Sequence, residues 1–232
     1  MTSVVIGDIK YNLREDFTIK DYITLKNFDM TLPFNWPRIF SEGFNVPFDI
    51  AVTVPMKNLE LGVVLIEAML NPVHEVLNKN LYGGELINLD TITLGEFIDL
   101  EVLVEKGFHK NIKDILSILY KIEIKDTYLF KDFYKSIEYY LKWRENIYKS
   151  YQYLFNLDKY SDEEEEKRTN TDIRHSWYDV IMILADGKFL NVNKVTEQPL
   201  VSAFNWLAWN KDRLEKEELE IMKIKQEQKQ RR

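Results

Sequence analysis

The stretch ITLGEFIDLEVLVEKGFHKNIKDILSILYK, residues 92–121, sets the fold class of this chain. Thr93 and Glu96 form the T-x-x-E pattern of a capping box, which predicts that a helix begins there. Gly107 is placed to end it, because glycine readily adopts the left-handed conformation that follows many helices. The next helix has apolar residues at the spacing of one buried face: Ile112, Ile115, Leu116 and Leu119. Two consecutive amphipathic helices predict a mainly α-helical fold.

The N-terminal residues predict a small β element followed by a helix. Apolar and polar residues alternate around Ile9, Tyr11 and Leu13, as in a half-buried strand. Thr18 then has the position of an N-cap, with Asp21 at the third helical residue to complete a capping box. The fold class expected from the whole chain is an irregular multi-helix domain with this β element and a C-terminal helical hairpin extension.

Residues 31–56 contain four prolines, at positions 33, 37, 47 and 55, with aromatic residues between them. Proline interrupts regular helix, so this region predicts an irregular packed segment. We expect a short helix near Ile39 and a strand over residues 50–54. A helix over residues 58–70 follows, and Asn71-Pro72 ends it.

The C-terminal half predicts two long helical regions separated by a charged segment. A helix is expected over residues 131–155, where aromatic side chains line one stripe. Residues 161–172 include four consecutive glutamates and read as a solvated linker. A further helix ends at Gly187, and a last helix begins near Pro199 and becomes mostly charged after Lys211. The predicted domains are therefore residues 1–160 and 173–232, joined by this acidic linker.

Composition narrows the classes of function. The chain has 232 residues, a net charge of −7 and no cysteine, which excludes disulfides, thiol nucleophiles and cysteine-based metal sites. Net negative charge disfavours nonspecific nucleic-acid binding. The exception is the basic tail over residues 223–232, which either touches nucleic acid or an acidic protein surface, or is a solvated helix end. Residues 1–10 lack the features of a signal peptide, and residues 61–70 are too short to span a bilayer.

No motif in the sequence carries chemistry. The chain lacks a nucleophile elbow, a metal-binding H-E-x-x-H, a P-loop and a dinucleotide-binding glycine pattern. Its three histidines are dispersed, and His175, near Asp172 and Asp179, is the least implausible catalytic or metal candidate. The carboxylates Glu96, Asp99 and Glu101 are accounted for by helix capping and the helix dipole. The sequence therefore predicts a non-enzymatic protein with no catalytic residue, cofactor or metal ion.

Two segments resemble proteins of tailed bacteriophages. Residues 92–121 resemble a segment of phage structural modules, in which a GEFIDLE-like helix is followed by a glycine and a second amphipathic helix ending in Leu-Tyr. Residues 177–218 resemble the C-terminal pattern of phage tail-assembly proteins, a helix, an LA-D-G turn and a charged final helix. These segments cover about 70 of 232 residues, and with the composition they resemble a phage of the crAss-like type.

The resemblance implies a role in building a phage neck or tail, and two functions remain open. In the first, the chain is a virion component, such as a ring subunit or head–tail adaptor. In the second, it is a tail assembly chaperone that binds the tape-measure protein and is absent from the mature virion. Both imply synthesis in the host cytoplasm, no membrane, and portal, tail or tape-measure proteins as partners. The ring implies a homo-oligomer.

Aromatic residues are the expected anchors of these contacts, because tryptophan and tyrosine contribute much of the energy of protein interfaces. Two regions supply them, the proline-rich segment and the start of the last helix. The predicted interface residues are Trp36, Phe40, Phe44, Trp206 and Trp209. The competing interpretation is that these rings fill the protein's own core.

Overall fold

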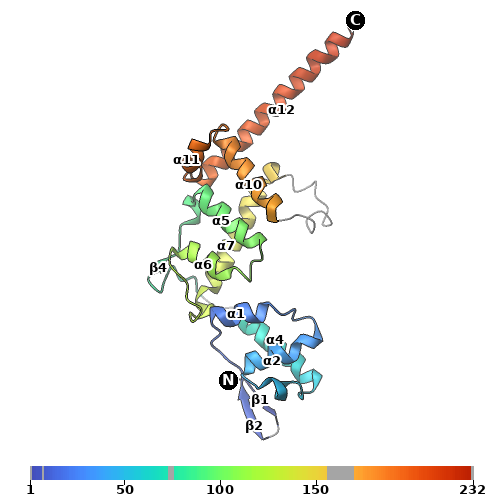
Figure 1. The fold of residues 1–232 in the computed structure, drawn as a ribbon, viewed down its shortest axis with the longest axis vertical. Coiled ribbons are helices and arrows are strands. Elements are labelled where there is room, and N and C mark those ends of the chain that lie inside the picture. Colours follow the sequence, from blue (N-terminus) through green and yellow to red (C-terminus); the bar gives the residue numbers. More distant parts are fainter. Residues whose placement is uncertain (1, 7, 73–75, 156–169, 231–232) are drawn as a thin grey trace. The chain divides into compact units, whose positions relative to one another are not determined.

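A computed structural model describes residues 2–6, 8–72, 76–155 and 170–230, with side chains described outside residues 170–176 and 227–230. The chain is mainly helical, with a small β element near the N-terminus and a C-terminal helix, as predicted (Figure 1). It divides into two compact units. Unit 1 comprises Met1–Ile87 and Leu103–Tyr140, and unit 2 comprises Asn88–Val102 and Leu141–Arg232.

This division differs from the predicted one, which placed everything before the acidic linker in one domain. Residues 88–102 and 141–155 group with the C-terminal helices because their side chains share one aromatic core with them. The predicted linker at residues 161–172 lies largely outside the described residues, so the structure does not bear on it.

Unit 1 begins with a two-stranded antiparallel sheet. Strand β1 (Ser3–Ile6) pairs with β2 (Ile9–Asn12), with Ser3 opposite Asn12 and Ile6 opposite Ile9. The alternation around Ile9 predicted β2, whereas β1 was not predicted. Helix α1 (Ile19–Lys26) follows and begins with the predicted capping box. The Thr18 hydroxyl accepts from the Asp21 backbone N–H at 3.3 Å, and the Asp21 carboxylate accepts from the Thr18 backbone N–H at 2.9 Å.

The proline-rich segment consists of short helices joined by turns. It forms η1 (Pro33–Asn35), α2 (Trp36–Phe44) and α3 (Phe48–Ala51), so the helix expected near Ile39 is confirmed. The strand predicted over residues 50–54 is wrong. The β-branched residues there have strand propensity, but none of the described strands pairs with them. Ile50 and Ala51 complete α3, and turns follow, in which the Val54 N–H donates to the Ala51 carbonyl at 3.2 Å.

Helix α4 (Met56–Leu70) packs against α2 at very short range, because glycines lie at the contact. A Cβ atom at Gly62 would be 2.4 Å from Cδ2 of Phe40, and one at Gly43 would be 2.1 Å from Cδ1 of Ile66. Any larger residue at either position would therefore separate the two helices.

The remainder of unit 1 is a hairpin and a helical pair. Strands β3 (Asn80–Leu81) and β4 (Gly84–Glu85) are joined through Tyr82 and Gly83, both at positive φ. Helix α6 (Ile112–Tyr120) packs beside the start of α7 (Phe130–Ser150). The buried Tyr120 hydroxyl lies 2.5 Å from the Ser136 hydroxyl and donates to the Asn78 carbonyl at 2.6 Å. The polar end of this aromatic side chain is thus satisfied.

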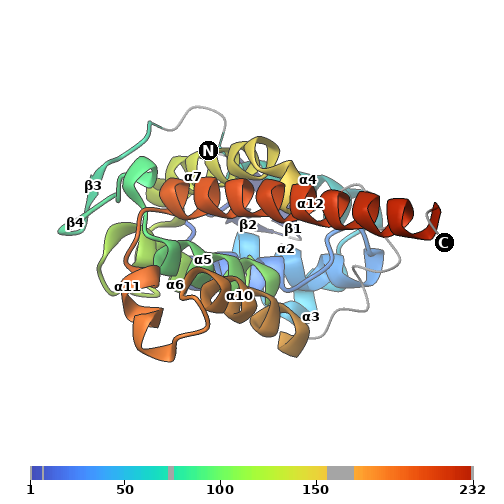
Figure 2. The ribbon, with the colours of Figure 1, turned by 90° about the horizontal axis from the view of Figure 1, so that it is seen from above.

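Unit 2 is an all-helical cluster. It contains η2 (Leu89–Thr91), most of α5 (Leu94–Glu105), the end of α7, α8 (Gln152–Phe155), α10 (Asn170–Leu184), η4 (Phe189–Asn191), α11 (Val192–Thr196) and α12 (Leu200–Gln230). Gly107 and Gly187 have φ of +116° and +68° and follow the ends of α5 and α10, as predicted. α10 and α11 are neighbours, and α12 is one uninterrupted helix (Figure 2).

The core of unit 2 is centred on Phe97, a fully buried residue of α5. Four aromatic rings have their centroids 5.6–6.4 Å from it, and they belong to Trp143, Tyr148, Trp177 and Phe204. The starts of α5 and α12 are joined by two backbone hydrogen bonds, from Leu94 N–H to the Gln198 carbonyl and from Leu200 N–H to the Ile92 carbonyl. The first turn of α12 is therefore anchored in the unit.

Candidate protein-contact surfaces

The predicted aromatic anchors of the proline-rich segment face inward. Phe40 and Phe44 are buried in unit 1, with exposed fractions of 0% and 3%, and their rings stack 4.5 Å apart. Trp36 is half-buried, and its indole N–H donates to the Met30 carbonyl at 2.8 Å. Phe40 and Phe44 lie four residues apart on one face of α2, and this spacing is the signal of burial. These two residues therefore fill the protein's own core and are not available to a partner.

The two tryptophans of α12 lie on the surface. Trp206 is 41% exposed and Trp209 is 58% exposed, and their ring centroids are 6.5 Å apart. The guanidinium of Arg213 lies 5.6 Å from the centre of the Trp209 ring. Trp206 and Trp209 have the accessibility that an interface anchor needs, and their contact with another chain stays a prediction.

Helix α12 has two parts with different surroundings. Leu200, Ala203 and Phe204 are buried in unit 2, whereas every side chain described from Asp212 to Gln226 is exposed. Figure 1 shows this later part leaving the rest of unit 2. The exposed part carries large apolar side chains that are 45–57% exposed, namely Leu214, Leu219, Ile221, Met222 and Ile224. Such a concentration of exposed apolar side chains on one helix marks a candidate contact surface.

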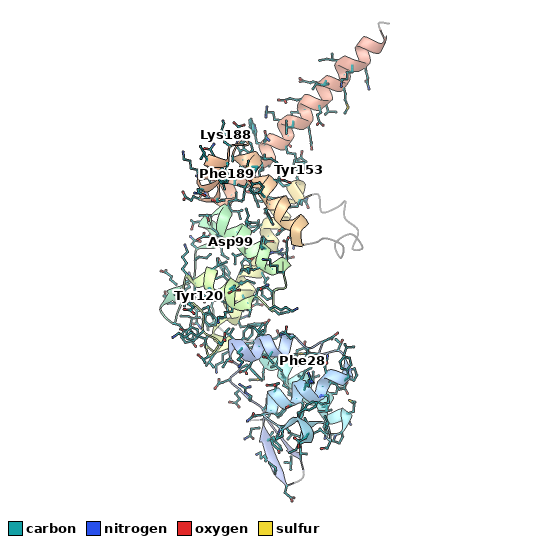
Figure 3. The ribbon with its side chains drawn as sticks, viewed as in Figure 1. Phe28, Asp99, Tyr120, Tyr153, Lys188 and Phe189 are labelled. Carbon is teal, nitrogen blue, oxygen red and sulfur yellow. The ribbon has the colours of Figure 1, made fainter. Side chains whose placement is uncertain are left out.

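The boundary between the two parts of α12 is a contact with α8 at Tyr153 (Figure 3). The Lys211 ammonium donates to the Tyr153 carbonyl at 2.6 Å and lies 4.2 Å from the centre of its ring. Hydrogen bonding to the Glu215 carboxylate, desolvation and hydrogen bonding to Asp212 raise the pKa of Tyr153. The first three turns of α12 are thus packed in the unit, and Asp212 and Glu215 of the next turn contact it through Tyr153.

A second candidate surface lies on α4 in unit 1. One face of this helix is buried against α2, and the other carries Leu61, Val64, Leu65 and Ala68 at the i, i+3, i+4, i+7 spacing. Leu61 and Val64 are 56% and 58% exposed, and Leu65 is 37% exposed. We call these four residues the outer α4 face. An amphipathic helix of another chain could bind there, since such helices insert apolar residues at this spacing.

The most strongly bound charged group of unit 2 is Glu101, which has no exposed surface. Its carboxylate accepts hydrogen bonds from Nε and Nη2 of Arg144 at 2.6 and 2.7 Å, and from the Tyr148 hydroxyl at 2.7 Å. Arg144 and Tyr148 are four residues apart on one face of α7, so the pair approaches Glu101 together. The position of Glu101 in α5 predicted only an interaction with the helix dipole, because both partners are more than forty positions away in the sequence.

Two other carboxylates of α5, Glu96 and Asp99, lie near the start of the helix. Glu96 closes the capping box, accepting from the Thr93 backbone N–H at 3.0 Å, while the Thr93 hydroxyl accepts from the Glu96 N–H at 3.2 Å. Desolvation and the neighbouring Glu96 carboxylate raise the pKa of Asp99, which lies on the exposed side of the helix (Figure 3). Both capping residues were predicted from the sequence.

Of the three histidines, His109 is the one whose side chain the structure describes. His109 Nδ1 lies 2.7 Å from the Tyr22 hydroxyl, and desolvation and the charge of Lys26 lower the pKa of His109. His74 and the side chains of His175 and Asp172 lie outside the described residues, so the candidate site there is untested. Among the residues described, no three His, Asp or Glu side chains are grouped as metal ligands would be.

In that same part of the chain, no helix is both long and apolar enough to cross a membrane.

A small open pocket lies beside α2 in unit 1, with a volume of about 260 Å³. Its lining residues are Phe28, Arg38, Ser41, Glu42 and Phe48, and Figure 3 marks Phe28. The Arg38 guanidinium lies 5.7 Å from the centre of the Phe48 ring. The lining charges, Arg38 and Glu42, are both exposed, so the pocket has no buried polar group to orient a ligand.

Comparison of the chain with models of protein families, with curated proteins and with solved structures finds no match. The two exposed helical surfaces, on α4 and on α12, are therefore the features from which a function can be argued.

Proposed function

We propose that this chain is a non-enzymatic assembly protein that acts by binding other protein chains. The observation that carries the proposal is the exposed part of α12, from Asp212 onward. It holds five large apolar side chains in solvent, and it makes a helix that unit 2 does not cover. Helices of this length are marginally stable alone in water and are normally stabilised by packing an apolar face. A partner chain would provide that packing.

We propose further that the assembly is the neck or tail of a tailed phage, with the chain as a ring subunit or head–tail adaptor. This rests on the resemblance of residues 92–121 and 177–218 to phage structural proteins. Hydrogen bonds between Leu94 and Gln198 and between Leu200 and Ile92 join the two segments, which supports considering them together. Trp206 and Trp209 are the anchors that such a contact would use, because large exposed aromatic residues dominate interface energetics.

The outer α4 face favours a second candidate function, that of a tail assembly chaperone. A chaperone that coats a long tape-measure protein needs an apolar strip that accepts an amphipathic helix, and Leu61, Val64 and Leu65 form such a strip. The net charge of −7 would also keep such a protein soluble while it holds apolar segments.

Quantitative mass spectrometry of purified mature virions and of infected-cell lysate separates these functions. A ring or adaptor subunit is present in the particle at a fixed ratio to the portal protein. A chaperone is abundant in the lysate and absent from the particle. Absence of the chain from both would refute the assignment to phage assembly.

A further inference from the structure

The exposed part of α12 carries an apolar ridge that continues from the anchored part. Leu207, Leu214 and Ile221 are spaced by seven residues, which places them in line along one side of the helix. Leu207 is half-buried, whereas Leu214 and Ile221 are 45% and 50% exposed. Because each residue of a helix is rotated by about 100° from the last, Leu219 and Met222 lie off this ridge.

Charged residues follow one flank of this ridge in a fixed order. Arg213 comes first, and Glu217 and Glu220 follow at the i+4 and i+7 positions of the same flank. The flank is therefore basic toward the N-terminal end and acidic toward the C-terminal end. A second α12 that lies antiparallel would bring its own Arg213 beside Glu217 and Glu220, and the reverse contact would form at the other end. A parallel copy in register would instead place Glu217 against Glu217.

Apolar residues at the two ends of the flank fit the same arrangement. Trp206 and Ile224 are eighteen residues apart, which is five helical turns, so they lie on the same side of α12. Both are exposed. In an antiparallel pair, Trp206 of each copy would cover Ile224 of the other, across an overlap of about 27 Å.

The contacts within the chain leave this flank available. α8 contacts α12 through Lys211, Asp212 and Glu215, which lie away from this flank, whereas the Arg213 and Glu217 side chains are 47% and 52% exposed. Arg213 already donates to Glu217 at 2.9 Å and to Asn210 at 3.0 Å. A guanidinium has five N–H donors, so Arg213 can keep these bonds and still donate to Glu220 of a second copy.

We propose that two copies of this chain pair antiparallel through residues 206–224 of α12. The occupant of the ridge is a second copy because the flank is complementary to itself when reversed, in both charge and apolar character. This goes beyond the proposed function, which requires only that the chain bind some protein. Leu219 and Met222 stay free in the pair for another partner.

Two single charge reversals and their mixture test this arrangement. Arg213→Glu makes the contacts of residue 213 with both Glu217 and Glu220 of the other copy repulsive, and Glu220→Arg does so for the contacts between residues 213 and 220. Each variant alone should dimerise roughly tenfold or more weakly than the natural chain. An equimolar mixture should dimerise more tightly than either variant alone, because residue 213 of the first variant then faces residue 220 of the second with opposite charge, and Arg213 and Glu220 keep their natural contact at the other end. Sedimentation velocity over a range of concentrations measures all three.

Several results would overturn the proposal. The natural chain could remain monomeric at concentrations up to roughly 300 µM, which corresponds to a very weak interface. The mixture could dimerise no better than the separate variants, as expected for a parallel pair or for contact through another surface. Circular dichroism of each variant controls for loss of helix, and mixing changes no contact within either chain.

Two uncharged substitutions on opposite sides of α12 provide a matched control. Leu214→Gln on the ridge should abolish dimerisation in the measured range, whereas Leu219→Gln, away from the ridge, should leave it unchanged. Equal effects of the two substitutions would contradict the proposal. These measurements are independent of the virion analysis, so pairing through α12 and the phage assignment can each fail while the other stands.

Discussion

Helices α4 and α12 both expose apolar residues, but the rest of the protein holds them in different ways. The inner face of α4 is packed closely against α2, with glycines at the contact, so this helix is formed whether or not its outer face is covered. From Asp212 onward, every described side chain of α12 is in solvent. Apolar side chains with similar exposed fractions on the two helices therefore have different consequences for stability. Covering the outer α4 face would add affinity for a partner, whereas covering α12 would also stabilise the helix itself.

In unit 2, from which α12 extends, we expect the largest loss of stability when the buried ion pair of Glu101 and Arg144 is broken. Arg144→Met leaves the carboxylate of Glu101 buried with only the Tyr148 hydroxyl as a described partner. We expect a loss of about 3 kcal/mol in the free energy of unfolding, since a buried charge without its counterion is strongly destabilising. Arg144→Lys should cost less, because it keeps the charge and loses the two-point geometry. Chemical denaturation measures both, and equal stability of all three chains would contradict this account of Glu101.

The packing of α4 on α2 should be the next most sensitive point. Gly62→Ala places a methyl group 2.4 Å from a ring carbon of Phe40, which lies in the core of unit 1. Overpacking of this kind costs about 2 kcal/mol. Ala68→Ser, on the outer face of the same helix, should change stability by less than about 0.5 kcal/mol. Thermal unfolding of the two variants compares the two faces directly, and similar losses would mean that the outer face is also packed.

The cap of α1 should make the stability of unit 1 depend on pH. Burial opposes ionisation of Asp21, but hydrogen bonds from Arg14 and from Thr18 lower the pKa of its carboxyl group below 3.8. The stabilisation is therefore fully present above that value and is lost as the pH falls through the lower pKa of the folded state. Asp21→Asn should cost about 1 kcal/mol at neutral pH and little at pH 2. Denaturation of both chains at the two pH values tests this, and a constant difference would contradict it.

The smallest effect on stability is expected for a substitution of Trp209, on the exposed surface of α12. Trp209→Ala removes a ring that is 58% exposed, so the free energy of unfolding should change by less than about 0.5 kcal/mol. Incorporation of the variant into the assembly should fall nonetheless, as measured by mass spectrometry of particles. A loss of stability that matches the loss of assembly would place Trp209 in the core instead.

The features that the sequence predicted correctly are local ones. The capping boxes at Thr18 and Thr93 and the helix ends before Gly107 and Gly187 depend on residues within a few positions of one another. Their backbone conformations follow from hydrogen bonding and from glycine's freedom at positive φ. Such features can be read without knowing what each helix packs against.

The features that were missed or misassigned depend on distant parts of the chain. Residues 50–54 have strand propensity, but a strand needs a neighbouring strand, and none of those that the structure describes lies there. Glu101 meets Arg144 only because α5 and α7 pack together. Phe40 and Phe44 were predicted as interface anchors from the aromatic content of their segment. Aromatic content does not show whether a ring faces the core or the solvent. Their i, i+4 spacing beside Ile39 and Gly43 was the available sign of a buried face.

The most direct test of the central claim, that the exposed part of α12 binds protein and does not hold the fold, is to end the chain after Lys211. Sedimentation and thermal unfolding would compare this shortened chain with the full one. We predict unfolding temperatures that agree within about 2 °C, together with complete loss of self-association. Every described side chain that is removed is exposed, and the hydrogen bonds of Asp212 and Glu215 with Tyr153 lie at the surface, where they contribute little stability. Undiminished self-association, or a large fall in unfolding temperature, would contradict the account.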